Sequence, residues 1–254
     1  MVKKIFFLLI LTSLVASCRN QKRTSDPSNK EEAGEQIHAK QNTLTGSEKS
    51  DGWVLLFDGS SINGWHLYNK PGTKPIWEAV DGELACDPLN GTGDHGDLVS
   101  DMEFENYDFT FEWKITESGN SGVFINVVED PAFQQAWYTG PEYQLLDSQN
   151  KDFEIEEKRS GCLYGFSAQI TETATKPAGQ WNTARIKQAN GKAEFYLNGN
   201  LTARVDFNSD EWKELVASSG FKDFPKFGVA TKGHIVLQEW TSPVWFRNLK
   251  IKEL

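Results

Sequence analysis

The sequence predicts an all-β protein, a sandwich of two antiparallel sheets with one short surface helix. Three observations favour this fold class. Many short runs alternate apolar and polar residues, Gly, Asn, Asp and Pro separate these runs, and helical periodicity is scarce. The pattern begins at residue 52, and the roughly 200 residues that follow are an ordinary length for a single large sandwich. We therefore expect one folded domain, from 52 to 254.

The predicted strands are the segments in which the alternation holds. They cover residues 53–57, 77–80, 83–86, 96–100, 108–116, 121–128, 142–147, 161–165, 181–188, 192–197, 201–206, 226–231, 234–240 and 244–253. Two hairpins are expected at Asp81-Gly82 and Asn198-Gly199, because these dipeptides favour the type I′ turn. The predicted helix covers residues 210–218 and has Ser209 as its N-cap.

The N-terminus has the pattern of an export signal. Lys3 and Lys4 precede a short apolar run at residues 5–11, and the segment 14–18 (Leu-Val-Ala-Ser-Cys) resembles a bacterial lipobox. The apolar run is too short to span a bilayer. This resemblance implies a signal peptide at residues 1–17 and lipidation of Cys18. We therefore expect a protein anchored by lipid in the Gram-negative cell envelope, at the outer membrane or the periplasmic face.

A polar segment, residues 18–51, separates the predicted signal from the predicted domain. It is rich in Lys, Glu, Gln, Asn, Ser and Thr, and cannot bury enough apolar surface to offset its ordering entropy. The sequence therefore predicts a disordered tether here.

The charge balance limits the partners. The whole chain carries 26 basic and 36 acidic residues, so removal of Lys3 and Lys4 with the signal would leave 24 against 36, a net charge of −12. Such a chain lacks the basic surface that nucleic acid requires, and it should not adsorb to anionic lipid by charge. A membrane contact is expected through the lipid anchor only. Export permits a disulfide between Cys86 and Cys162, but the spacing does not demand one, and we favour two buried free thiols.

The strand at residues 142–147 carries the most suggestive polar pattern. Side chains alternate along a strand, so Glu142 and Gln144 should share one face. Asp147 has the opposite parity, and a β-bulge would be needed to turn it to that face. The polar set would then line one wall of a cleft. The alternative is an ordinary strand with a polar outer face, followed by a turn that starts at Asp147.

Several motifs together resemble one family, the 3-keto-disaccharide hydrolase domain, over residues 53–254. The motifs are residues 55–65 (LLFDGSSINGW), 119–124 (GNSGVF), 141–147 (PEYQLLD), 160–164 (SGCLY), 180–182 (QWN) and 244–251 (VWFRNLKI). The resemblance implies a concanavalin A-like jelly roll with a sugar site on its concave sheet. It also implies a small carbohydrate substrate whose 3-hydroxyl has been oxidised to a ketone.

A ketone at C3 acidifies the proton at C2, so the bond from C1 to its substituent can break by elimination, and water can add later. This route needs a base at C2, a donor or cation for the enolate oxygen, and an acid for the leaving oxygen. The candidate base is Glu142 or Asp147, because burial raises the pKa of a carboxyl group. Hydroxyl or keto groups could be bound by the amides Asn120, Gln144 and Gln238, and an enolate stabilised by Arg247 or Lys158.

Other features bear on the site. Family members often carry Leu-Gln-Asp-His-Gly before the last strand, whereas this chain has Trp240 in place of that histidine, which leaves His234 as the nearest candidate for proton transfer. A divalent metal held by Glu142, Asp147 and His234 is a possible cofactor, but the sequence shows no H-x-x-x-H or C-x-x-C spacing. Since sugars stack on aromatic rings, we expect Trp137 and Tyr138 to form the floor of the cleft.

Two other functions fit the same residues. One is a non-catalytic carbohydrate-binding module. The other is an ordinary jelly-roll glycosidase, because E-x-Q-x-x-D has the spacing of the E-x-D-x-x-E strand of jelly-roll endoglucanases. In that strand the two outer glutamates act as nucleophile and acid, so the amide and the shorter acid of this chain disfavour double displacement.

Overall fold

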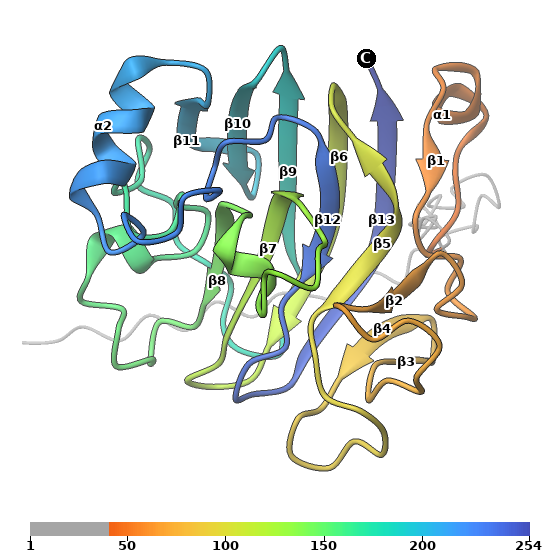
Figure 1. The fold of residues 1–254 in the computed structure, drawn as a ribbon. Coiled ribbons are helices and arrows are strands. Elements are labelled where there is room, and N and C mark those ends of the chain that lie inside the picture. Colours follow the sequence, from red (N-terminus) through yellow and green to blue (C-terminus); the bar gives the residue numbers. More distant parts are fainter. Residues whose placement is uncertain (1–40) are drawn as a thin grey trace, which may run out of the picture. The chain divides into compact units, whose positions relative to one another are not determined.

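A computed structural model describes residues 41–254, which form two antiparallel β-sheets (Figure 1). The predicted all-β fold class is therefore confirmed. The larger sheet has eight strands: β11 (Asn200–Asp206), β10 (Lys192–Leu197), β9 (Asn182–Ala189), β6 (Tyr107–Ile115), β13 (Val244–Glu253), β4 (Glu83–Cys86) and β3 (Glu78–Val80) in that order, with β1 (Val54–Leu55) beside β13. The smaller sheet has the order β2 (Trp65–Leu67), β5 (Leu98–Phe104), β12 (Gly233–Leu237), β7 (Asn120–Val127) and β8 (Glu142–Leu146).

The hydrophobic core fills the space between the two sheets. Tyr143 of the smaller sheet meets Phe111 and Phe195 of the larger sheet edge-to-face, with ring centroids 5.8 and 5.4 Å apart. Phe111 in turn packs against Phe246 of β13. All four rings are at least 98% buried. The apolar positions of each strand therefore face the opposite sheet, which leaves the other face of the smaller sheet free to carry polar groups.

The strand predictions hold for most of the chain, with three exceptions. β2 (Trp65–Leu67) was not predicted, because it is only three residues long. Residues 161–165 form turns rather than a strand, with Gly161 and Gly165 at positive φ and only an isolated bridge from Leu163 to Tyr143. Residues 226–231 also form turns, in which Phe227 joins an aromatic cluster below α2.

The predicted turns and helix are present. Asp81-Gly82 and Asn198-Gly199 both have two consecutive residues at positive φ, as a type I′ turn requires. Helix α2 (Asp210–Ser218) starts at Ser209, whose side chain accepts a hydrogen bond from the backbone N–H of Trp212. Two short 3₁₀ helices, η1 (Ala136–Tyr138) and η2 (Glu156–Lys158), were not predicted.

The folded region also begins earlier than predicted. Helix α1 (Gly46–Ser50) lies inside the segment expected to be a disordered tether, and a capping box from Thr45 and Glu48 closes its first turn. Asn42 is buried and exchanges hydrogen bonds with Asn248 of β13. These contacts attach the end of the predicted tether to the sandwich.

The predicted signal peptide, Cys18 and most of the tether lie outside the described residues. Within residues 41–254, none of the helices has the length and apolar character needed to cross a membrane. Cys86 and Cys162 are both buried free thiols, as expected.

Candidate functional site

The outer face of the smaller sheet carries the polar residues of β8. Tyr143 and Leu145 point into the core, so Glu142 and Gln144 point away from it, as the alternation of the strand predicted. The neighbouring strand β7 runs in regular antiparallel register, with Gln144 opposite Gly122 and Glu142 opposite Phe124. Asn120 of β7 lies on the same face. The carboxyl group and the amides of two adjacent strands are therefore gathered on one surface.

Glu142 lies directly over Gly122. A Cβ atom on Gly122 would lie 1.9 Å from Oε1 of Glu142 and 2.7 Å from its Cδ. Only a glycine leaves room for this carboxyl group to lean across β7 towards the middle of the sheet. Gly122 is thus a structural requirement of the Glu142 rotamer.

Gln144 fixes the orientation of the Glu142 carboxyl group. With its amide nitrogen turned towards Glu142, Gln144 donates to Glu142 Oε1 at 2.9 Å and to the carbonyl oxygen of Ser121 at 3.1 Å. Its oxygen then lies 3.2 Å from the side-chain amide of Asn120. The three side chains form a connected set, and a substrate that enters the site meets them together.

These residues line a pocket of about 250 Å³, which is large enough for a sugar ring. Its polar lining comes from Asn120, Glu142, Gln144 and Gln238, and its aromatic lining from Trp137, Tyr164, Phe221 and Trp240. Asn120, Gln144, Gln238 and Trp137 therefore lie where the sequence analysis placed them, around Glu142.

The aromatic side of the pocket is a packed wall. Trp137 of η1 meets Phe224 and Phe221 edge-to-face, with ring centroids 4.8 and 6.3 Å apart. Phe221 stacks on Phe227 at 4.1 Å, and Phe227 packs against Trp212 of α2. The rings that face the pocket are therefore held by the helix and the turns after it, and they offer a preformed apolar surface to a sugar.

The electrostatic environment favours the neutral form of Glu142. The residue is only 9% exposed. Burial raises the pKa of Glu142 well above its ordinary value of 4.5, and the negative charge of Asp97 raises it further. A carboxyl group with a raised pKa is a stronger base once it is ionised, which suits proton abstraction.

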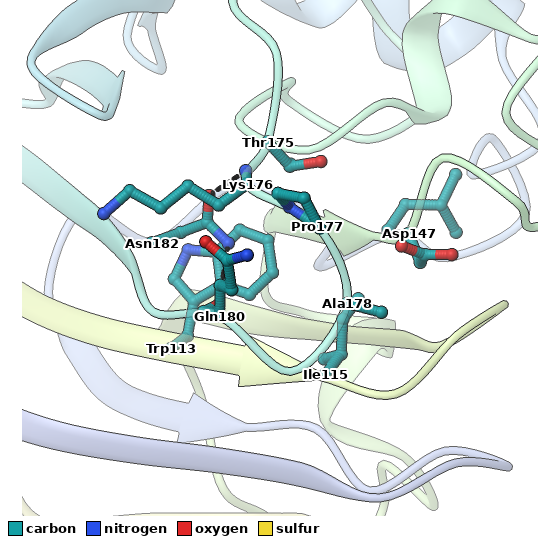
Figure 2. A pocket seen from close by; sticks show the side chains of 10 residues that line it. Trp113, Ile115, Asp147, Thr175, Lys176, Pro177, Ala178, Gln180 and Asn182 are labelled. Atoms are coloured by element: carbon teal, nitrogen blue, oxygen red, sulfur yellow. Dashed lines mark hydrogen bonds between the residues drawn. The ribbon is translucent and has the colours of Figure 1, made fainter.

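The predicted partner Asp147 is not part of this pocket, because β8 has no bulge that would turn it to the face of Glu142. Asp147 lies just after β8, and its Oδ1 accepts hydrogen bonds from the backbone N–H groups of Ser118 and Gln149 at 2.8 and 3.0 Å. Figure 2 shows Asp147 at the side of a second hollow, where residues 175–178 pass over Trp113. Asp147 therefore starts a turn, as the alternative interpretation expected for this residue.

His234 and Arg247 also lie elsewhere. His234 lies on β12, where its Nδ1 contacts the carbonyl oxygen of Ser100 at 2.7 Å, and it does not line the pocket. Arg247 belongs to the larger sheet, where it donates to Glu112 and stacks over Trp181. Neither residue is part of the lining of the pocket beside Glu142.

Lys158 and Tyr138 are neighbours of the pocket rather than parts of its lining. Lys158 donates to Asp152 at 3.1 Å and lies 5.7 Å from the ring centroid of Tyr164, which does line the pocket. Tyr138 packs against Trp137 with its centroid 4.6 Å away. Each of the two residues therefore contacts an aromatic residue of the pocket lining without being part of that lining.

The proposed metal ligands do not converge. Glu142 lies in the pocket, Asp147 caps a turn and His234 bonds the backbone of β5. In the part of the chain that the structure describes, no three His, Cys, Asp or Glu side chains are grouped to hold a metal ion. This predicted ligand set therefore does not fit a metal ion.

Four residues of the site were not predicted as such. Tyr164, Phe221 and Trp240 line the pocket, and Asp97 influences Glu142. Tyr164 lies inside one of the motifs that carry the family resemblance, and Trp240 stands where that resemblance implies a histidine in many members, so both had a signal in the sequence. Phe221 and Asp97 are brought in by the fold from distant segments.

Comparison with known proteins identifies the family. Residues 52–252 match the model of the 3-keto-alpha-glucoside-1,2-lyase-like domain. The chain belongs to this family. Its membership confirms the resemblance found in the sequence, and with it an enzyme of the glycoside hydrolase class.

Individual relatives agree with this assignment. The chain is 28% identical to a protein of Bacteroides thetaiotaomicron named 3-keto-disaccharide hydrolase, over the full length of both. A crystal structure from Parabacteroides distasonis, provisionally named a glycosyl hydrolase, is 32% identical, with a TM-score of 0.77 over 85% of this chain and 100% of the other. A second such structure from the same organism, 23% identical with a TM-score of 0.60 over 80% of this chain and 99% of the other, shares the fold.

Proposed function

We propose that this protein cleaves 3-keto-glycosides, with Glu142 as the base that removes the proton from C2 of the oxidised sugar. The observation that carries the proposal is the position of Glu142: a buried carboxyl group with a raised pKa, at the wall of a sugar-sized pocket lined by amides and aromatic rings. The family membership and the B. thetaiotaomicron relative support the choice of a 3-keto sugar.

The proposed reaction starts with transfer of the C2 proton to Glu142. The electrons of the C2–H bond move into the enolate of the C3 ketone, and the bond from C1 to the leaving oxygen then breaks. The leaving oxygen takes up a proton from water. The hydroxide that remains can add to C1 of the resulting enone, and Glu142 then returns its proton to C2, which completes a net hydrolysis. Because the charge develops on the keto oxygen, the reaction depends on hydrogen-bond donors there rather than on a second nucleophilic carboxylate.

The amides of the pocket can supply these donors. Gln238 lies in the lining without a side-chain hydrogen bond among those found for residues 41–254, so its NH₂ group is available to a substrate. Gln144 binds Glu142 through its NH₂ group and Asn120 through its oxygen, and both amides can also bind sugar hydroxyls. The aromatic lining excludes water from the base, which keeps the pKa of Glu142 raised.

The decisive test replaces Glu142 by Gln, which keeps the size and the acceptor for Gln144. The variant is expected to bind a 3-keto-disaccharide while its turnover falls on the order of 10²–10⁴-fold, the usual contribution of a positioned general base. Release of the leaving sugar and any enone absorbance would be followed with the purified domain.

Asp147→Asn is the matched control, because its carboxyl group faces a turn instead of the pocket. It should keep wild-type turnover. A wild-type protein that binds the sugar and never turns it over would indicate a binding module, and equal cleavage of unoxidised disaccharides would indicate an ordinary glycosidase.

We also propose that the chain is exported and lipidated at Cys18, in the cell envelope of a Gram-negative bacterium. The support is the basic, apolar and lipobox pattern of residues 3–18. Metabolic labelling with a fatty acid should mark the wild type and leave Cys18→Ser unlabelled. A wild-type chain that stays unlabelled would contradict the proposal.

A further inference from the structure

A fourth segment of the smaller sheet brings another carboxylate to the site. Gly122 pairs with Gln144, and the backbone N–H of Gln238 donates to the carbonyl oxygen of Gly122 at 2.9 Å. On the far side of β12, Leu237 pairs with Leu98, so Gln238 is next to Asp97. One row across the smaller sheet therefore runs from Gln144 through Gly122 and Gln238 to Asp97.

Asp97 is held firmly at the end of this row. Its backbone carbonyl oxygen accepts from the N–H of Tyr68, and its Oδ1 accepts from the backbone N–H of Glu239 at 3.0 Å. The Glu239 side chain is itself bound by the ring of His95 and the backbone N–H of Gly96. These bonds fix the segment before β5 against the segment after β12, so the Asp97 carboxylate has little freedom to turn away.

The Glu142 side chain lies over Gly122, so its carboxyl group points along the row that ends at Asp97. The charge that shifts the pKa of Glu142 is the carboxylate of Asp97, and the charge that shifts the pKa of Asp97 is the carboxylate of Glu239. In residues 41–254, neither Glu142 nor Asp97 forms a salt bridge with a cation. Burial raises the pKa of Asp97 to about 7, and the nearby Glu239 charge adds to the rise.

We propose that Asp97 is a positioning residue that controls the proton on Glu142 and strengthens it as a base. The inference rests on the proposed function of Glu142. When both carboxylates are ionised they repel one another, and this repulsion is relieved as Glu142 takes the C2 proton. The C2–H bond breaks, an O–H bond forms on Glu142, and the negative charge moves from Glu142 into the enolate, farther along the substrate.

Within residues 41–254, six other titratable groups lie around Glu142 and Asp97. They are Tyr164, which lines the pocket, with Lys158 behind it; Glu239 and His95, bonded to one another beside Asp97; and Tyr68 and Cys86, which neighbour Asp97 from the ends of β2 and β4. None of these places a positive charge between the two carboxylates, so their titrations should be coupled.

The test is Asp97→Asn, which removes the charge and keeps an acceptor for the Glu239 N–H. The rise of kcat/KM with pH should move to lower pH, because Glu142 then ionises more readily. A midpoint that is lower by about one pH unit gives a roughly tenfold larger ionised fraction of Glu142 at acidic pH. At high pH, kcat should fall severalfold, because Glu142 is then a weaker base. A merely structural defect would instead lower the rate at every pH.

Asp101→Asn is the matched control. It makes the same charge change nearby, on β5, but Asp101 binds His66 away from the pocket. It should leave the pH profile in place. Asp97→Glu restores the charge and should return the midpoint towards the wild-type value, and circular dichroism would show that each variant is folded.

Infrared spectroscopy separates this inference from the proposed reaction. The carboxylic C=O band that Glu142→Gln removes can be titrated without any substrate. If Asp97→Asn moves the titration of that band to lower pH, while neither the wild type nor any variant turns over the sugar, the inference about Asp97 is supported and the proposed reaction is wrong. If the band and the kinetic midpoint stay where the wild type and Asp101→Asn have them, the inference about Asp97 is wrong.

Discussion

Gly122→Ala is the sharpest test of the geometry at the site, because it changes a residue that is not part of the pocket lining. The added methyl carbon would lie 1.9 Å from Oε1 of Glu142, with Cδ and Cγ at 2.7 and 2.8 Å. Gly122 sits in the middle of the sheet between β8 and β12, so its backbone cannot move aside without breaking pairs on both sides. The Glu142 side chain must move instead.

The size of the movement follows from these distances. Ordinary van der Waals contact begins at 3.4 Å, so the Glu142 carboxyl group must withdraw by about 1.5 Å. A misplacement of roughly 1 Å at a reacting group can cost about 10²-fold in rate, and overpacking of a buried site typically costs about 1–3 kcal/mol of stability. We therefore expect kcat/KM to fall at least about 10²-fold with a moderate loss of stability.

The assay is turnover of a 3-keto-disaccharide together with urea unfolding. Gly46→Ala is the control, because a Cβ at this first residue of α1 meets nothing within 4 Å and its backbone is helical. It should leave both the rate and the stability unchanged or slightly raise the stability. The double variant Gly122→Ala/Glu142→Asp shortens the clashing side chain, and it should recover stability without recovering activity.

Wild-type kcat/KM together with an unchanged free energy of unfolding in Gly122→Ala would contradict this prediction. That result would mean that Glu142 has a second rotamer that is equally active, and the orientation set by Gln144 would then have no role. An unfolded variant would be resolved by the shortened double variant, which removes the overlap.

Three other predictions follow from the structure. Desolvation lowers the pKa of His66, but its hydrogen bonds to Glu129 and Asp101 raise it by more, so the net pKa lies above its ordinary value of 6.5. Protonated His66 should therefore stabilise the folded protein fully below pH 6.5, and this stabilisation should be lost as the pH rises through the folded pKa. Over the same pH range, the difference in urea unfolding free energy between the wild type and His66→Gln should shrink. Trp240 is 52% exposed at the rim of the pocket, so Trp240→Ala should raise KM severalfold with kcat and thermal stability nearly unchanged; a loss confined to kcat would contradict a role in binding. Gln188 is fully buried, its NH₂ nitrogen lies within hydrogen-bonding distance of three oxygens, and its own oxygen accepts from the Asn126 amide. Gln188→Leu should therefore cost about 3 kcal/mol in chemical unfolding, since each orphaned buried polar group costs about 1–3 kcal/mol. A loss below about 1 kcal/mol would show that water replaces the amide.

The sequence was informative where a local rule determines the geometry. The alternation of a strand placed Glu142 and Gln144 on one face, and the D-G and N-G dipeptides located two hairpins, because each outcome depends on neighbouring residues only. Of the two aromatic residues predicted for the floor of the cleft, Trp137 lines the pocket and Tyr138 does not. These features could be predicted without knowledge of which strands pair.

The errors came from features that depend on distant contacts. A bulge at Asp147 was needed to complete the predicted polar wall, but the N–H groups of a turn already satisfy that carboxylate. Asp97 is 45 residues before Glu142 in the sequence. The register of β5, β12 and β7 places the two residues on one face of the smaller sheet. His234 has the same parity as Gln238, but it lies too far along β12 to reach the pocket. Parity gives the face of a sheet, whereas the position on that face requires the register.

The proposed role of Glu142 as a buried base implies a cost in the stability of the folded protein. A buried carboxyl group whose folded pKa is raised stabilises the protein least when it is ionised, so Glu142 should lower stability progressively as pH rises from its unfolded value of 4.5 towards its folded pKa. A cation beside Glu142 would remove this cost, but it would also lower the pKa and weaken the base. The described residues instead place amides and Asp97 around it, and this arrangement keeps the proton affinity high. The described residues thus surround Glu142 without a salt bridge, and this arrangement agrees with its proposed role as the base.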